Sequence, residues 1–141
     1  MKQFKRYIDK DGAGDVTLVC DEAEDMWHVY NLVRVGDTVR CTTIRKVTAE
    51  SSTGSTSSQR VHTTLSVCVE TVDFDGVACI LHLKGKSVAE NEYVKKGQYH
   101  TLDIAVGRKF QLSKQCWDSI DLDRLNLALD VCFNMLLHNK I

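Results

Sequence analysis

Short runs in which apolar and polar residues alternate cover most of the chain, and this is the pattern of half-buried β-strands. The first two runs, residues 4–8 and 16–20, flank a segment at 11–15 in which two glycines stand among aspartates. Because glycine and aspartate favour tight turns, this part of the sequence predicts a β-hairpin.

Two longer runs in the middle of the chain, residues 37–48 and 61–72, are rich in β-branched residues and predict two further strands. Side chains two residues apart share one face of a strand, so one face of this pair gathers apolar side chains. These are Val39, Cys41, Leu65 and Val67. We expect the two segments to pair antiparallel in a strongly bent sheet, with this face toward the core.

The remaining strands are shorter. A turn at Asp75-Gly76 predicts that residues 77–83 return as a strand beside the segment before them. Residues 85–97 have the composition of a loop, and the runs 100–106 and 109–112 predict two more strands.

Two helices are predicted, one on each side of the long central strands. The first begins at the acid-rich segment 22–25, since acidic residues are favourable at a helix amino terminus. Its expected apolar stripe is Met26, Trp27, Tyr30 and Val33. The second is predicted over 116–129, with Ser113 as the N-cap. Its expected inward residues are Trp117, Ile120, Leu125 and Leu129.

This order of elements predicts a mostly β fold with two flanking helices, arranged as a small closed β-barrel. The 141 residues are enough for one domain with a hydrophobic core and too few for two ordinary domains.

A polar segment separates the two long strands. Residues 49–60 are mostly serine, threonine and glycine, so they bury too little surface to offset the entropy of ordering, and we expect 49–59 to be disordered in the free domain. Cationic and imidazole side chains stand at the strand ends on either side of it. They are Arg45, Lys46, Arg60 and His62, a set suited to RNA phosphates, although solvated surface charge is the alternative.

The net charge of −1 gives no reason to expect a nucleic-acid partner, but the charges are segregated along the chain. Residues 34–62 hold five basic residues against two acids, and residues 84–114 hold seven against three. Residues 9–25 hold seven acids against one lysine. A basic face and an acidic face are therefore predicted, with ordinary solvated surface as the other interpretation.

Six cysteines are present without CxxC spacing or a histidine at ligand spacing, and no signal-peptide pattern begins the chain. We therefore predict an intracellular protein with no disulfide and no structural zinc. No run of residues approaches the roughly 20 apolar positions that cross a bilayer.

No pair of residues indicates a nucleophile with its base, so we predict no catalytic residues. The acids Glu22, Glu24 and Asp25 could hold a divalent metal, because hard cations prefer carboxylate oxygens. The other interpretation, which we favour, is that they stabilise the amino terminus of the first helix.

Several motifs resemble one known family in the same order along the chain. The segment 24–33 reads EDMWHVYNLV and is followed by Gly36-Asp37. Further segments are TIRKV at 43–47, ESSTGS at 50–55, VETVDFD at 69–75, ENEYVK at 90–95 and WDS at 117–119. Over residues 1–130 the chain resembles the Pelota family of ribosome-rescue factors, in their N-terminal domain.

The resemblance implies an Sm-like or SH3-like β-barrel that recognises stalled ribosomes at the decoding site. It implies that the loop residues Glu50, Ser51, Ser52, Thr53, Gly54 and Ser55, with the basic strand ends, contact rRNA and the mRNA channel. The implied partners of the full-length protein are a translational GTPase and an ATP-driven ribosome-splitting factor, which lead to subunit dissociation and to no-go and non-stop mRNA decay.

The resemblance further implies a cytoplasmic protein, with the nucleus as a second compartment, that needs no cofactor and is not an enzyme. The alternative hypothesis is a divalent-metal-dependent endoribonuclease acting on mRNA. Residues 131–141 do not resemble the continuation of the family. We therefore expect a truncated chain, with a divergent tail in place of the middle and C-terminal domains.

Overall fold

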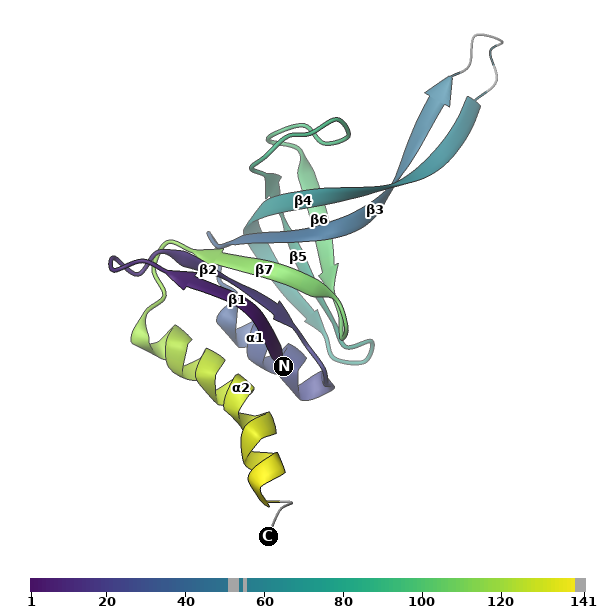
Figure 1. Cartoon of the computed structure of the whole chain (residues 1–141). Helices are drawn as coiled ribbons and strands as arrows, with labels where there is room; N and C mark the ends of the chain where they lie inside the picture. Colours follow the sequence, from purple (N-terminus) through teal and green to yellow (C-terminus); the bar gives the residue numbers. More distant parts are fainter. Residues whose placement is uncertain (51–53, 55, 139–141) are drawn as a thin grey trace.

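Seven strands form one antiparallel sheet, in the order β1-β2-β7-β3-β4-β5-β6, and two helices pack beside it (Figure 1). The computed structural model describes residues 1–50, 54 and 56–138, with side chains for all of these except 45–50, 56–58 and 130–138. The elements are β1 (Lys2–Ile8), β2 (Gly14–Val19), α1 (Ala23–Leu32), β3 (Thr38–Glu50), β4 (Thr56–Asp75), β5 (Ile80–Ser87), β6 (Tyr99–Ile104), β7 (Lys109–Lys114) and α2 (Ser119–His138).

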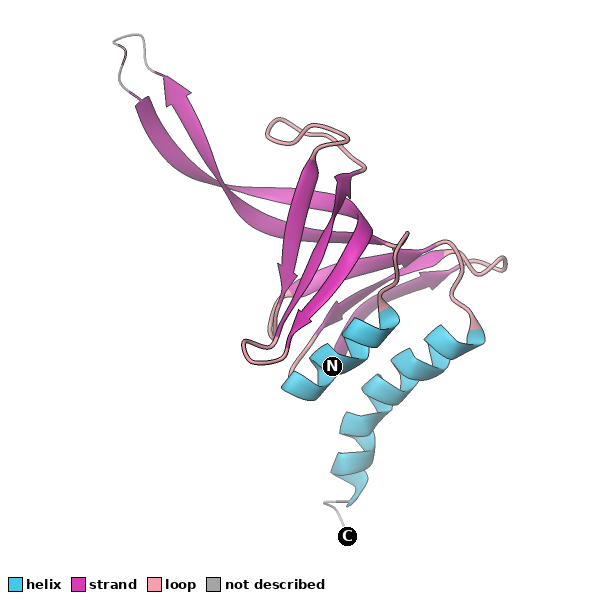
Figure 2. Cartoon of the chain, turned by 180° about the vertical axis from the view of Figure 1, so that it is seen from behind, coloured by secondary structure: helices cyan, strands magenta, loops and turns pink. Residues whose placement is uncertain are grey.

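The long central hairpin is confirmed. Strands β3 and β4 pair antiparallel from Thr38 opposite Cys68 to Glu50 opposite Thr56. The predicted inward residues Val39, Cys41, Leu65 and Val67 are all buried in the core. The distal part of this hairpin projects away from the rest of the sheet (Figures 1 and 2).

The polar loop is shorter than predicted. Ala49 and Glu50 lie in β3, and residues 56–59 lie in β4, because the two strands continue to pair beyond their β-branched segments. Disorder over 49–59 is therefore wrong for these strand residues. The prediction for residues 51–53 and 55 falls outside the described part of the chain.

Strand β4 bends sharply where it changes partners. It pairs with β3 as far as Cys68 and with β5 from Val67 onward, with a bulge between Val69 and Thr71. This bulge lets one 20-residue strand serve both halves of the sheet. The strongly bent sheet expected from the sequence is thus confirmed.

The sheet is open, so the prediction of a closed barrel is wrong in that detail. In the part of the chain that the structure describes, edge strands β1 and β6 do not pair with each other. Helix α1 adds Met26, Val29 and Leu32 to the core, so a helix buries apolar surface that a closing pair of strands would otherwise cover.

The turn after β4 is also longer than predicted. Residues 76–79 form it, so β5 begins at Ile80 instead of Val77. Strand β5 then continues to Ser87, into the segment predicted as a loop. The reason is that β5 keeps a strand partner on each side over this range, β4 and β6.

Helix α1 has the predicted start but a different buried face. Its buried apolar residues are Met26, Val29 and Leu32, and Val33 follows at the C-cap. Trp27 and Tyr30 are exposed, so the predicted apolar stripe matches the buried face only at Met26 and Val33. Trp27 instead packs against Arg124 of α2, whose guanidinium lies 5.4 Å from its ring centroid.

Helix α2 begins later than predicted. Ser113 is not its N-cap but a residue of β7, paired with Asp15 of β2. The Asp118 side chain instead accepts a hydrogen bond from the N–H of Asp121 (2.8 Å), which is N-cap geometry. Ile120 is exposed, contrary to the prediction, and α2 runs to His138 within the segment expected to be a divergent tail.

Five of the six cysteines have described side chains, and each carries a free thiol. They are Cys20, Cys41, Cys68, Cys79 and Cys116. None of the helices over the described residues is long and apolar enough to cross a membrane.

Candidate nucleic-acid interface

The backbone register brings the predicted basic positions of the hairpin together. Lys46 in β3 stands opposite Arg60 in β4, and Arg45 stands opposite Val61. One step nearer the core, His62 stands opposite Ile44, and both side chains are exposed. The hairpin therefore leaves the core at this pair, and Arg60, the one basic residue beyond it whose side chain the structure describes, is exposed.

The tip of the hairpin is placed only in part. Glu50 ends β3 opposite Thr56, and Gly54 is exposed with a left-handed φ of 81°. A glycine adopts such a φ without steric cost, which suits a turn. The predicted contact residues Ser51, Ser52, Thr53 and Ser55 lie outside the described residues.

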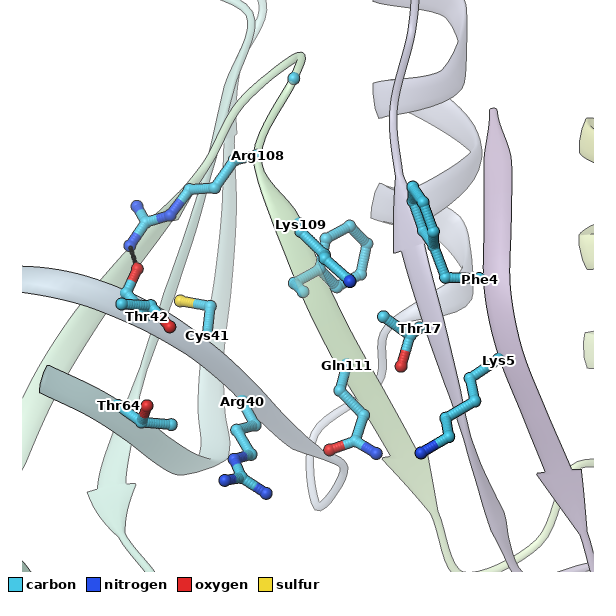
Figure 3. A pocket seen from close by; sticks show the side chains of 12 residues that line it. Phe4, Lys5, Thr17, Arg40, Cys41, Thr42, Thr64, Arg108, Lys109 and Gln111 are labelled. Atoms are coloured by element: carbon cyan, nitrogen blue, oxygen red, sulfur yellow. Dashed lines mark hydrogen bonds between the residues drawn. The ribbon is translucent and has the colours of Figure 1, made fainter.

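A basic groove lies at the base of this hairpin, on the face of the sheet that points away from the core (Figure 3). Its volume is about 770 Å³. We call it the outer-face groove and define it by Phe4, Lys5, Arg40, Arg108, Lys109 and Gln111, with Thr17, Cys41, Thr42, Thr64, Gly107 and Phe110 completing the lining.

One row of paired residues crosses four strands and forms the floor of the groove. Lys5 of β1 stands opposite Thr17 of β2, which stands opposite Gln111 of β7, which stands opposite Arg40 of β3. Directly paired residues point to the same face of a sheet. The row therefore presents a cation at each end and neutral hydrogen-bonding side chains between them.

A β-bulge adds an aromatic ring to the same face. Strict alternation along β1 would send Phe4 and Lys5 to opposite faces, but the register shifts between Gln3 and Lys5, and both side chains line the groove. The Phe4 ring is 56% exposed, and the Lys109 ammonium lies 4.5 Å from its centroid.

Arg108 forms the wall nearest the hairpin. Its guanidinium donates hydrogen bonds to the backbone carbonyls of Thr42 (2.9 Å) and Asp103. These bonds hold the side chain between the β6–β7 turn and β3, and Arg108 forms no salt bridge with any carboxylate whose position the structure describes. A second hollow of about 310 Å³ shares Thr42 and Thr64 with the groove and extends to His62.

The groove is electrostatically uncompensated. Four of its lining residues are cations and none is an acid. Within the described side chains, Lys5, Arg40 and Lys109 take part in no salt bridge. This concentration of positive charge favours an anionic ligand.

Inspection of the sequence found only part of the groove. Arg108 and Lys109 belong to the basic stretch at 84–114 and Arg40 to the one at 34–62, but Lys5 stood apart from both. The available signal was the alternation itself, which places Arg40 and Thr42 on the face opposite Val39 and Cys41. The cross-strand register that unites these residues is not visible in one sequence.

The acidic residues at the start of α1 lie beside the amino-terminal ammonium of Met1. Asp25 Oδ2 lies 2.8 Å from the ammonium of Met1, and Asp21 lies 3.3 Å from the same group. Asp25 Oδ2 also accepts hydrogen bonds from the backbone N–H groups of Asp21 (2.9 Å) and Glu22 (3.1 Å). Burial acts to raise the pKa of Asp25, but these contacts outweigh it, so its pKa lies below the usual value.

These contacts do not fit a divalent metal at Glu22, Glu24 and Asp25. The one buried carboxylate of the three, Asp25, already has its Oδ2 engaged by an ammonium and two N–H groups. Among the residues that the structure describes, no group of three or more histidine, cysteine or acidic side chains is arranged to hold a metal ion.

Comparison with known proteins gives one consistent family. The sequence profile of the Pelota N-terminal domain matches residues 1–129. The protein pelota homolog of Caenorhabditis elegans is 63% identical over 130 residues, which are 92% of this chain and 34% of that protein. The chain thus spans about a third of the length of the curated relatives it matches.

Solved structures agree with this similarity and with the mostly β fold. Dom34 of Saccharomyces cerevisiae, described as a translation termination-like factor involved in RNA quality control pathways and interacting with Hbs1, aligns with a TM-score of 0.69 at 25% identity. That alignment covers 91% of this chain and 33% of Dom34. Archaeal Pelota, described as ribosome-bound together with ABCE1, aligns with a TM-score of 0.66 at 27% identity, over 86% of this chain and 35% of its own.

Proposed function

Because the chain belongs to the Pelota family, as a form of its N-terminal domain, we propose that it binds the decoding site of stalled ribosomes through the β3–β4 hairpin. The observation that carries the proposal is the projection of this hairpin from the sheet, with Lys46 opposite Arg60 along it (Figure 1). Arginine and lysine at such positions suit rRNA phosphates, and residues Glu50 to Ser55 would extend toward the mRNA channel.

In a protein of the relatives' length, this binding would serve ribosome rescue. The relatives described with Hbs1 and with ABCE1 support a translational GTPase and an ATP-driven splitting factor as partners. We propose that the outcome is subunit dissociation and no-go and non-stop decay of the message. The site of action would be the cytoplasm, with the nucleus as a second compartment.

The domain would act by binding, without a catalytic site or a cofactor of its own. The contacts of Asp25 support this over the endoribonuclease hypothesis, since its carboxylate is committed to the start of α1. Incubation of RNA with the purified chain and Mg²⁺ or Mn²⁺ decides between them. Cleavage that disappears in Glu24→Ala, an exposed position, would favour the nuclease.

Co-sedimentation with stalled ribosomes tests the binding proposal. Replacing Arg45 and Lys46 by alanine should weaken binding and flatten its dependence on salt, because fewer counterions are released from the RNA. The matched control is Lys95→Ala with Lys96→Ala, which removes the same charge from an exposed loop. Unchanged affinity and salt slope in Arg45→Ala/Lys46→Ala would show that the hairpin cations are solvated surface.

A further inference from the structure

We propose that the outer-face groove binds single-stranded RNA, with phosphates on its four cations and a base against Phe4. This site is separate from the hairpin tip, and it does not depend on the proposed role at the decoding site. It assigns a second RNA-contacting surface to the domain, at the root of the hairpin (Figure 3).

The charge balance indicates a polyanion. The whole chain carries a net charge of −1, yet the groove collects Lys5, Arg40, Arg108 and Lys109 without one lining carboxylate. Ion pairs elsewhere on the molecule show that acids are available, as in the contact of Arg34 with Asp121. A ligand with several negative charges would neutralise these four cations, which no carboxylate lining the groove does.

The spacing of the cations fits an extended chain better than a compact ligand. Lys5 and Arg40 are three strand positions apart in the same row, which corresponds to roughly 14 Å at the usual separation of paired strands. Thr17 and Gln111 stand between them and can donate to phosphate or sugar oxygens. The adjoining hollow at Thr42 and Thr64 reaches His62 but is also lined by Glu92, so the path without a lining carboxylate is the outer-face groove itself.

Phe4 favours RNA over an acidic polypeptide. Phe4 is more than half exposed on the groove face, and an aromatic ring adds nothing to the binding of a ligand recognised by charge alone. Bases stack on exposed aromatic rings with little sequence preference, and a neighbouring cation adds to the interaction. Lys109, 4.5 Å from the ring centroid, provides that cation and lies within reach of the phosphate beside a stacked base.

Fluorescence anisotropy with a short labelled oligouridylate tests the site on the chain as it stands. The variant Lys5→Gln/Arg40→Gln/Lys109→Gln should bind about tenfold more weakly or worse at low salt. Its plot of log affinity against log salt should become shallower by about 2 in slope, which is about 0.7 for each phosphate that the protein no longer neutralises. The charge-matched control Lys10→Gln/Lys95→Gln/Lys96→Gln, all at exposed positions, should keep the wild-type affinity and slope.

Substitutions of Phe4 test base stacking separately from electrostatic attraction, because they leave the charge of the groove unchanged. Phe4→Ala should weaken oligouridylate binding about fivefold or more, because one base can no longer stack. Phe4→Trp should retain the affinity and report base stacking through quenching of its added fluorescence. Thermal unfolding of each variant verifies that the fold is unchanged, since the substituted side chains are exposed.

Three results would overturn the proposal. The first is an equal loss of affinity in the groove variant Lys5→Gln/Arg40→Gln/Lys109→Gln and in its charge-matched control. The second is Phe4→Trp fluorescence that does not change when RNA is added. The third is displacement of oligouridylate by polyglutamate at equal charge concentration. The last result would identify an acidic polypeptide as the ligand. Arg45→Ala/Lys46→Ala should keep most of the oligouridylate affinity, so failure of the hairpin proposal and failure of the groove proposal are distinguishable.

Discussion

At the scale of single residues, Gly85 permits the bend on which the sheet depends. A Cβ atom at Gly85 would lie 1.8 Å from the carbonyl oxygen of Cys68, in the backbone of β4. This close approach occurs beside the bulge at Val69–Thr71, where β4 exchanges its partners. The absence of a side chain in β5 thus allows the two backbones to approach where the strand turns.

Gly85→Ala should therefore destabilise the domain, because the clash is with backbone and cannot be relieved by a side-chain rotation. We expect the free energy of unfolding to fall by about 1–3 kcal/mol, measured by urea denaturation. Gly76→Ala is the matched control, since a Cβ atom at that position would have no other atom within 4 Å. Equal stability of the two variants would show that the sheet relaxes around position 85.

Asp25 makes a second prediction at this scale, concerning pH. Its pKa is lowered in the folded protein, so its stabilising contribution is present above the unfolded value near 4 and is lost as the pH falls through the folded value. Asp25→Asn should lower the free energy of unfolding by roughly 2 kcal/mol at pH 7. The difference from wild type should shrink on acidification, and a gap that stays constant down to pH 2 would contradict this assignment.

At the scale of elements, a buried ion-pair network fastens α2 to the sheet. Lys114 ends β7 with a side chain only 2% exposed, and its ammonium contacts Asp37, just before β3. Its other neighbour is Asp121 of α2, at 4.0 Å, which also pairs with Arg34 at 3.0 Å. Burial raises the pKa of Asp121, and the two cations oppose that rise. Helix α2 is therefore held by charge to β7, through Lys114, and to the segment between α1 and β3, through Arg34, as well as by apolar packing.

Lys114→Met tests this network, since it keeps the bulk of the side chain and removes the buried charge. Asp37 would then lose its only cation among the described residues, and the buried Asp121 would keep Arg34 alone, so the free energy of unfolding should fall by about 3–5 kcal/mol. Lys109→Met on the same strand removes an exposed charge and should cost less than about 0.5 kcal/mol. A loss for Lys114→Met no larger than for Lys109→Met would mean that the network adds nothing to α2 docking.

Buried and exposed residues of unexpected type explain why the sequence pattern predicted some elements incorrectly. Ser113 has the chemistry of an N-cap, but β7 continues through it because Lys114 occupies a core-facing strand position, which its charge concealed. In α1, the predicted apolar stripe included Trp27 and Tyr30 because aromatic rings were treated as apolar. The structure instead completes the buried face with Val29 and Leu32. The long hairpin was predictable because β-branched alternation is strong over residues 38–47 and 61–72.

The candidate site was predictable to a different extent in its two parts. The hairpin cations Arg45, Lys46 and Arg60 flank a segment that is visibly polar in the sequence, so composition alone drew attention to them. Lys5 and Arg40 are 35 positions apart and meet only through the strand order β1-β2-β7-β3. No local pattern encodes such an order, because it arises from tertiary pairing.

At the scale of the whole molecule, the hairpin and the sheet are separable parts. Beyond Arg40 in β3 and before Val67 in β4, the paired residues that the structure describes pair only with one another. The exposed pair Ile44 and His62 marks where the hairpin leaves the core. The outer-face groove lies on the sheet side of that boundary, so the tip and the groove can be altered independently.

Replacing residues 47–59 with Asn-Gly should separate the two surfaces. This change keeps Lys46 opposite Arg60 and closes the shortened hairpin with a sequence that favours a two-residue turn. The free energy of unfolding should change by less than about 1 kcal/mol, because those removed residues that the structure describes in strands pair only with each other. Oligouridylate affinity should be retained, whereas binding to stalled ribosomes should weaken through loss of Glu50 to Ser55. Undiminished ribosome binding would assign recognition to the sheet and groove, and the tip would then be dispensable.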